Sequence, residues 1–258
     1  YFYQDLDMGG FGVSRYAYDQ WLVDQARDEG VLVLEGTRVI DSRLEGDTFN
    51  VTDHRGESYH SQLVIAAHGK RSTLDKALNR SFLRSRSPYV GVKYHMSLDM
   101  PKNLIALHNF PGGYCGVSAI EDDRYNVCYL VHRDRVRRAG TIGELERDVL
   151  SINPYLQQIF TQGISFFDKP MVFNEITFEK KEAVWNHMFM VGDAAGMITP
   201  LCGNGMAMSV RGAYELSRLI IKQYQKARFD RLTLEKENMN LWSGLIYDRL
   251  MEGRRAQR

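Results

Sequence analysis

The chain has 258 residues, a formal net charge of +1 and 25% charged residues. This length can bury a sizeable core in one large domain or two smaller ones. The nearly neutral charge gives no reason to expect a nucleic-acid partner, and no apolar run is long enough for a transmembrane helix. Cys115, Cys128 and Cys202 have neither metal-ligand spacing nor an even disulfide framework, so we expect free thiols in a reducing, cytoplasmic environment.

The first predicted element is a helix that begins after Ser14, a residue type that caps helices well. Apolar side chains follow at helical spacing from Tyr18 to Ala26, and Gly30 is a suitable end. Strands are then expected at 31–34, 39–44 and 48–52. A hairpin turn at 54–57 leads into a returning strand at 59–67.

A second region, from about residue 81 to residue 178, reads mainly as antiparallel strands. Alternating apolar and polar residues predict strands at 90–98, 104–110, 113–120, 125–132 and 171–178. Residues 141–161 predict a helix that is interrupted near Asn153-Pro154, where Pro can start a new helical turn. A strand at 185–191 and two long helices, at about 204–224 and 232–252, complete the chain.

The most informative stretch links the strand at 185–191 to the first of these two helices. The apolar run ends in Gly192-Asp193-Ala194-Ala195-Gly196, and Pro200 and Gly203-Asn204-Gly205-Met206 follow. A carboxylate at Asp193 can accept hydrogen bonds from sugar or ribityl hydroxyls. Glycine lets the backbone approach a flat ring, and a helix N-terminus favours negative charge beside it.

This stretch resembles the second FAD-binding motif of the p-hydroxybenzoate-hydroxylase-fold flavoproteins, most of all the geranylgeranyl-reductase-like group. The resemblance implies that Gly192 and Asp193 lie at the FAD ribityl chain. It places five further residues at the isoalloxazine edge: Pro200, Gly203, Asn204, Gly205 and Met206. An ordinary strand–turn–helix with small packing residues is the alternative interpretation.

Two shorter matches support the same family. An Arg at the start of the first helix reaches the FAD phosphates in this family, and Arg15 is the matching residue; a solvated surface Arg is the alternative. The family also has an Asp-Gly-x-x-Ser motif after a strand. Here Gly69 and Ser72 match, but His68 replaces the Asp, so we expect His68 to form hydrogen bonds at the end of a loop rather than to act as a catalyst.

The family normally opens with a Gly-x-Gly-x-x-Gly fingerprint that binds pyrophosphate. No such motif follows a strand near Tyr1. We therefore expect an N-terminally truncated form that purifies without bound flavin or is poorly soluble, and flavin binding once an upstream βαβ segment is restored.

The fold class that we expect is α/β plus α+β. A partial FAD-binding domain, residues 1–80 and 180–258, is interrupted by an antiparallel sheet domain for the substrate, residues 81–179, and ends in two helices. In the family this inserted sheet covers the flavin. Four aromatic or histidine side chains of the sheet are candidates for substrate binding: His95, Phe110, Tyr114 and Tyr129. The alternative interpretation is that they pack in an ordinary sheet core.

The expected function is that of a FAD-dependent oxidoreductase, a reductase or dehydrogenase of an apolar or aromatic small molecule, with NAD(P)H as a candidate electron donor. A flavin monooxygenase or halogenase of the same fold is one alternative. A binding module without cofactor is another. No catalytic residue, metal site or oligomeric state can be assigned from the sequence, and the flavin would supply the redox chemistry.

Overall fold

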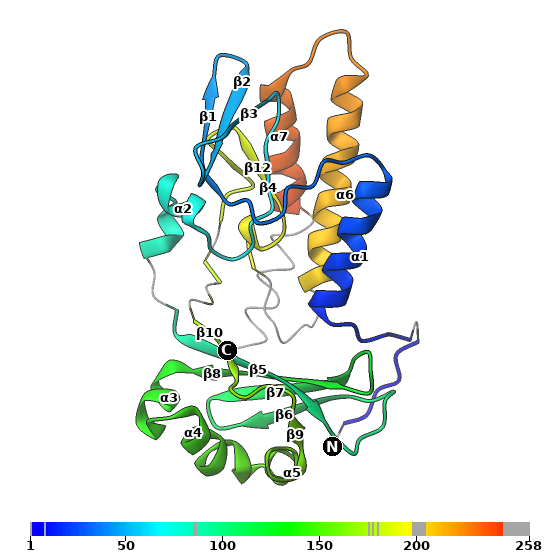
Figure 1. Cartoon of the computed structure of the whole chain (residues 1–258), viewed down its shortest axis with the longest axis vertical. Coiled ribbons are helices and arrows are strands. Elements are labelled where there is room, and N and C mark those ends of the chain that lie inside the picture. Colours follow the sequence, from blue (N-terminus) through cyan, green and yellow to red (C-terminus); the bar gives the residue numbers. More distant parts are fainter. Residues whose placement is uncertain are drawn as a thin grey trace. The chain divides into compact units, whose positions relative to one another are not determined.

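The computed structural model describes residues 2–7, 9–84, 87–174, 176, 178–179, 181–197 and 205–244. The chain divides into two compact units. Unit 1 comprises Tyr1–Glu35 and Ser87–Ile176, and unit 2 comprises Gly36–Arg86 and Thr177–Arg258. The mixed α/β architecture with antiparallel sheets confirms the expected fold class (Figure 1). Among the described residues, no helix is long and apolar enough to cross a membrane.

Helix α1 of unit 1, Arg15–Asp28, forms where the sequence predicted it. The Ser14 side chain accepts a hydrogen bond from the Ala17 amide, and the Ser14 amide donates to Glu121 at 2.8 Å. The chain leaves the helix through Gly30 at φ +81°, and the amide of Val31 bonds back to the carbonyl of Ala26.

The strand expected at 31–34 is wrong, because all four residues are described and none is in a strand. The Val31 amide belongs to the end of α1, and the side chains of Val31, Leu32 and Leu34 are exposed. A strand needs a partner whose backbone groups satisfy its own. The four consecutive apolar residues of this segment predicted a strand, but the sequence does not show whether a partner strand is available.

Unit 1 is built on an antiparallel sheet with the strand order β10-β5-β8-β7-β6, and β9 also pairs with β5. The expected strands agree with β5 to β8, and β9 was not predicted. Of the strand predicted at 171–178, β10 covers the first three residues, and residues 175 and 177 lie outside the described residues. The strands are β5 (Tyr89–Ser97), β6 (Ile105–Phe110), β7 (Gly113–Ala119), β8 (Tyr125–His132), β9 (Ile164–Ser165) and β10 (Met171–Phe173).

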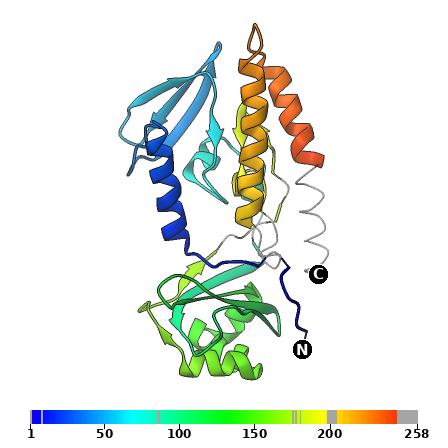
Figure 2. The same ribbon diagram turned by 90° about the vertical axis from the view of Figure 1, so that its right-hand side faces the viewer.

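Three helices lie along one face of this sheet: α3 (Arg133–Ala139), α4 (Ile142–Asp148) and α5 (Pro154–Gln162) (Figures 1 and 2). Capping by Thr141 and Asn153 breaks the expected helix at 141–161 into α4, a 3-10 turn and α5. Alternate residues of β5 and β8 pack with Leu145 and Leu156 in an apolar core. The strand period therefore divides this sheet into a core face and an opposite face.

Unit 2 contains two three-stranded sheets. In the first, β1 (Val39–Glu45), β2 (Thr48–Asp53) and β3 (Ser58–Ser61) form a meander, and the Asp53 carboxylate accepts hydrogen bonds from two amides in the predicted hairpin turn. The second has the order β11-β12-β4, with β4 (Ile65–Ala66), β11 (Val184–Trp185) and β12 (Met188–Met190).

The strand expected at 59–67 is thus divided between the two sheets as β3 and β4. Ser61 lies at the break, where its hydroxyl donates to the carbonyl of Leu63. The C-terminal helices of unit 2 are α6 (Gly205–Tyr224) and α7 (Arg231–Trp242), which lie side by side (Figure 2). The predicted end of the second helix, at residue 252, lies outside the described residues.

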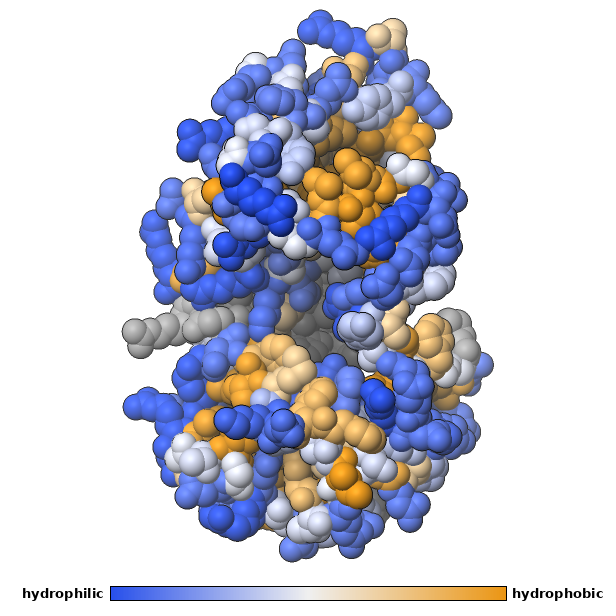
Figure 3. Space-filling view, in the orientation of Figure 1, coloured by the Kyte–Doolittle hydropathy of each residue, from blue (hydrophilic) through white to orange (hydrophobic). Residues whose placement is uncertain are grey.

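Apolar side chains remain on the surface of both units (Figure 3). On α1, which has no fully buried residue, they include Tyr16 and Trp21. On α6 they include Met206, Val210 and Tyr214.

Candidate functional site

Strands β4 and β12 are parallel, with Met190 opposite Ala66. Their carboxyl ends therefore reach the same edge of the sheet, which is where ligand loops form in parallel sheets. We call the residues that follow the two strands the β4 loop, 67–72, and the β12 loop, 191–197. The β12 loop contains Asp193, and the β4 loop contains His68 and Gly69, so two predicted motifs meet at one edge.

The β12 loop is held close to helix α6 by Gly192. This residue has φ +58°, and a Cβ placed on it would lie 2.9 Å from the hydroxyl of Ser209 in α6. A larger residue would be strained and would push the loop away from the helix. Asp193, the next residue, is half-buried beside a helix that begins at Gly205.

The β4 loop leads into a short helix, α2 (Thr73–Ala77), and Ser72 is the N-cap of this helix. The Ser72 hydroxyl accepts from the amide of Asp75, and the Asp75 carboxylate accepts from the amide of Ser72 at 2.7 Å. This reciprocal pair is a capping box. The second carboxylate oxygen of Asp75 lies 2.9 Å from Nε2 of His68, which confirms the expected hydrogen-bonding role of that histidine.

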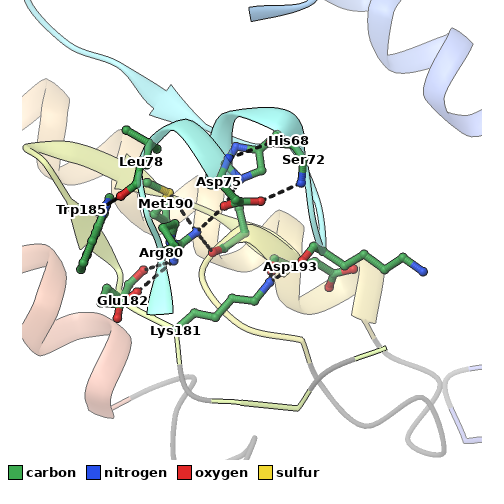
Figure 4. Close-up of polar contacts among 12 residues, drawn as sticks. His68, Ser72, Asp75, Leu78, Arg80, Lys181, Glu182, Trp185, Met190 and Asp193 are labelled. Carbon is green, nitrogen blue, oxygen red and sulfur yellow. Dashed lines mark hydrogen bonds and ion pairs between the residues drawn. The ribbon is translucent and has the colours of Figure 1, made fainter. Parts of the chain in front are cut away.

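The side chain of Arg80 connects the segments that follow strands β4 and β12 (Figure 4). Its side chain is fully buried, and its Nη1 donates to Asp75 at 3.1 Å and to the carbonyl of Ala194 at 2.8 Å. Its Nη2 donates to the carboxylate of Glu182 at 3.2 Å. One guanidinium thus joins the helix after the β4 loop, the β12 loop and the segment before β11.

Lys181 forms a second connection between the loops. Its Nζ donates to the carbonyl of Lys70 at 2.7 Å and to the carbonyl of Asp193 at 2.8 Å (Figure 4). The same atom lies 4.1 Å from the centre of the Phe82 ring. Only 2% of Lys181 is exposed.

The surroundings of Lys181 and Asp75 have opposite effects on the charged forms of the two side chains. Burial, with a contribution from the Arg80 charge, lowers the pKa of Lys181 to about 8. Burial acts to raise the pKa of Asp75, but hydrogen bonding and attraction to His68, the Ser72 amide and Arg80 outweigh it, so that this pKa is lowered. The site therefore favours an ionised Asp75 and disfavours an ionised Lys181.

The remaining predicted cofactor residues are distributed as follows. Gly205 and Met206 open helix α6, whereas Pro200, Gly203 and Asn204 lie outside the described residues. Arg15 lies at the start of α1 in unit 1, where its guanidinium makes two hydrogen bonds of 2.9 Å to Asp19. Its proposed contact with the FAD phosphates stays a prediction.

The predicted substrate residues are divided between the two faces of the unit 1 sheet. Phe110 and Tyr129 belong to the apolar core and contact each other edge to face. His95 and Tyr114 lie on the opposite face, because they alternate with core residues along β5 and β7. The Nε2 atom of His95 and the Oδ1 atom of its cross-strand neighbour Asn126 are buried, and neither has a hydrogen-bond partner among the described residues.

Four charged residues of the site were not predicted: Asp75, Arg80, Lys181 and Glu182. The spacing of Ser72 and Asp75 was an available capping-box signal. Lys181 and Glu182 stand in a run of charged residues, 179–182, a pattern that usually indicates a solvated surface. No local signal shows that Lys181 is buried, because its partners are main-chain carbonyls of distant loops.

The described residues fit FAD in the chemistry of their donors and acceptors. Asp193 offers a carboxylate for ribityl hydroxyls, and the N-terminus of α6 favours negative charge. Nδ1 of His68 is buried without a hydrogen-bond partner among the described residues. Beside it, Gly69 has φ +80° and open space where a Cβ would stand, so a ligand can come close to the β4 loop.

Comparison with known proteins identifies the family. A family model described as an FAD binding domain matches residues 12–238, so the chain belongs to that family. Digeranylgeranylglycerophospholipid reductase of Methanococcus vannielii is 25% identical over 227 residues, which cover 78% of this chain and 52% of the reductase. Tryptophan 2-halogenase of Chondromyces crocatus is 21% identical over 220 residues, which cover 79% of this chain and 42% of the halogenase.

The fold is also that of solved flavoproteins. The structure of Klebsiella pneumoniae HpxO complexed with FAD and uric acid matches with a TM-score of 0.64 and 18% identity over 94% of this chain and 62% of that chain. The chain spans about half the length of the curated relatives it matches. These likenesses confirm the expected p-hydroxybenzoate-hydroxylase fold and the relationship to geranylgeranyl reductases.

Proposed function

We propose that this chain contributes the ribityl and ring side of an FAD site in an FAD-dependent oxidoreductase. The observation that carries the proposal is the β12 loop, which brings Asp193 against helix α6 in a chain of the FAD-binding family. Asp193 orients the cofactor, the N-terminus of α6 favours charge on it, and Arg15 contributes to phosphate binding. Bound FAD supplies hydride and electron transfer.

The test is FAD binding by the natural protein that carries this sequence. We expect Asp193→Ala to raise the Kd of FAD about ten- to a hundredfold, since a charge-assisted hydrogen bond is lost. Asp47→Ala, which changes an exposed acid in the same unit, is the matched control. Kd is measured by quenching of flavin fluorescence. Equal FAD affinity of the Asp193 variant and the control would remove Asp193 from the site.

For the reaction we propose reduction or dehydrogenation of an apolar or aromatic small molecule, with NAD(P)H as electron donor and a cytoplasmic location. The unpartnered atoms of His95 and Asn126 support a substrate that also carries a hydrogen-bonding group, bound on the sheet face of His95 and Tyr114. The burial of Phe110 and Tyr129 favours a core role for those two residues.

The relatives fit a monooxygenase or halogenase equally well, so the experiment must separate the three reactions. Mass spectrometry of products formed with NAD(P)H, O₂ and chloride does so directly. A product that differs from its substrate by two hydrogens supports the reductase or dehydrogenase. Incorporation of an oxygen atom would show a monooxygenase instead, and incorporation of a halogen atom would show a halogenase.

A further inference from the structure

Lys181 is buried with all its hydrogen-bonding capacity directed at neutral groups. Its ammonium has three N–H donors, and it meets two main-chain carbonyls and the face of Phe82. A lysine with these contacts and 2% exposure cannot reach a substrate as a nucleophile. What it can do is hold its neighbours in place.

The neighbours it holds are the two loops of the candidate site. Lys70 belongs to the β4 loop and Asp193 to the β12 loop, and both carbonyls bind the same Nζ atom at 2.7 and 2.8 Å. Two bonds from one tetrahedral centre fix the separation of the two main chains. The bond to Asp193 acts on the residue whose carboxylate is proposed to bind the ribityl chain.

This arrangement costs stability instead of adding to it. Burial of an ammonium ion is unfavourable unless a carboxylate compensates it closely, and the hydrogen bonds of Lys181 go to carbonyls. The lowered pKa reports the same cost. A methionine of similar length would fill the space without a buried charge, so packing alone does not explain a lysine here.

We propose that Lys181 is a positioning residue of the FAD site, which clamps the β4 and β12 loops and thereby sets the orientation of Asp193. This inference rests on the proposed function. It assigns to Lys181 no contact with the cofactor, only an effect transmitted through the carbonyl of Asp193.

The experiment compares Lys181→Met, Lys181→Gln and the control Lys76→Met, an exposed lysine of α2, in the natural protein that carries this sequence. We expect Lys181→Met to raise the Kd of FAD at least tenfold, while the unfolding midpoint of the FAD-free protein stays the same or rises. Lys181→Gln keeps an amide that can donate to both carbonyls, so it should restore part of the affinity. Lys76→Met should bind FAD as the unchanged protein does.

The pH dependence of the Kd of FAD provides a second test, because a lysine with a purely structural role would not make FAD binding depend on pH. Arg80, Asp75, Asp193 and Glu182 are the charged groups that act on Lys181, and side chains of these types ordinarily keep their charge between pH 7 and 9. When Lys181 loses its proton it keeps two N–H donors but loses the charge that strengthens both hydrogen bonds, so we expect the FAD affinity of the unchanged protein to fall over this range toward that of Lys181→Gln. The Lys181→Met variant should show a flat profile.

The outcomes separate the two proposals. No FAD binding by the unchanged protein would overturn the proposed function and the role of Lys181 with it. A Kd of Lys181→Met within twofold of the control, or an unfolding midpoint that falls in parallel with affinity, would overturn the clamp alone. A loss of affinity with an intact fold and partial recovery in Lys181→Gln supports the clamp.

Discussion

Glu146 of unit 1 is half-buried and Asp75 of unit 2 is fully buried, and the pKa values of these two carboxyl groups are shifted in opposite directions. In unit 1, Oε1 of Glu146 accepts hydrogen bonds of 2.8 Å from the hydroxyls of Tyr94 and Tyr129. Burial raises the pKa of Glu146, and the two tyrosine hydrogen bonds only partly oppose it. In unit 2, the pKa of Asp75 is lowered, because His68, the Ser72 amide and Arg80 outweigh burial.

The difference lies in what each network connects. Glu146 joins helix α4 to two neighbouring strands of a continuous sheet, which an apolar core already holds together. Asp75 and Arg80 join loops that leave the short strands β4 and β12, and they do so beside an apolar core that includes Met190, Ala194 and Ala195. Charge-assisted hydrogen bonds are directional. We infer that unit 2 adds buried charge to its apolar packing to hold loops at fixed positions, whereas the sheet of unit 1 is held mainly by apolar packing.

The largest expected effect is in unit 2. Arg80→Met removes the partner of Asp75 and the donor to the Ala194 carbonyl, and it leaves a buried carboxylate with reduced compensation. Such a change lowers the free energy of unfolding by about 3–5 kcal/mol. Urea denaturation measures it. Arg43→Ala, which breaks an exposed pair with Asp41, should cost at most about 1 kcal/mol. Similar losses for the two variants would contradict the proposed importance of buried charge.

The counterpart in unit 1 tests apolar packing. Leu145 is completely buried in the core beneath the six-stranded sheet. Leu145→Ala should lower the free energy of unfolding by about 2–4 kcal/mol, because it removes apolar contact and leaves a cavity. FAD affinity, measured below the unfolding transition, should stay unchanged. A specific loss of FAD affinity would show that this core also determines the geometry of the cofactor site.

The sequence predicted the features that depend on local interactions and missed those that depend on contacts between distant segments. Caps and periodicity are local, so Ser14, Thr141 and Asn153 mark helix starts correctly, and the strands β5 to β8 follow their alternating pattern. The division of the segment 59–67 into β3 and β4 depends on two different partner strands. Local alternation contains no information about partners.

The candidate site shows the same limit. Asp193 could be located because its loop has a recognisable residue spacing, and Ser72 because it follows Gly69 at the family's spacing. Lys181 was missed because its role depends on carbonyls of two loops that are remote in sequence. A carbonyl has no residue-type signature, so no motif could have revealed this contact.

The smallest expected effect, and the finest test of the comparison, is the titration of Glu146. Glu146→Gln keeps an oxygen that accepts from Tyr94 and Tyr129, so the change at neutral pH should stay within about 1 kcal/mol. The native pKa of Glu146 is raised above 4.5, so its contribution to stability is complete below pH 4.5 and is lost as pH rises through the native pKa. Urea denaturation from pH 4 to 8 should therefore show the unchanged protein losing stability relative to Glu146→Gln as pH rises.

Glu146→Leu, which leaves both tyrosine hydroxyls without their acceptor, should be destabilised at every pH. Parallel pH profiles for the unchanged protein and Glu146→Gln would mean that the fold accommodates the ionised form of Glu146 as well as that of Asp75. The two units would then differ only in that Asp75 has Arg80 as an ionic partner.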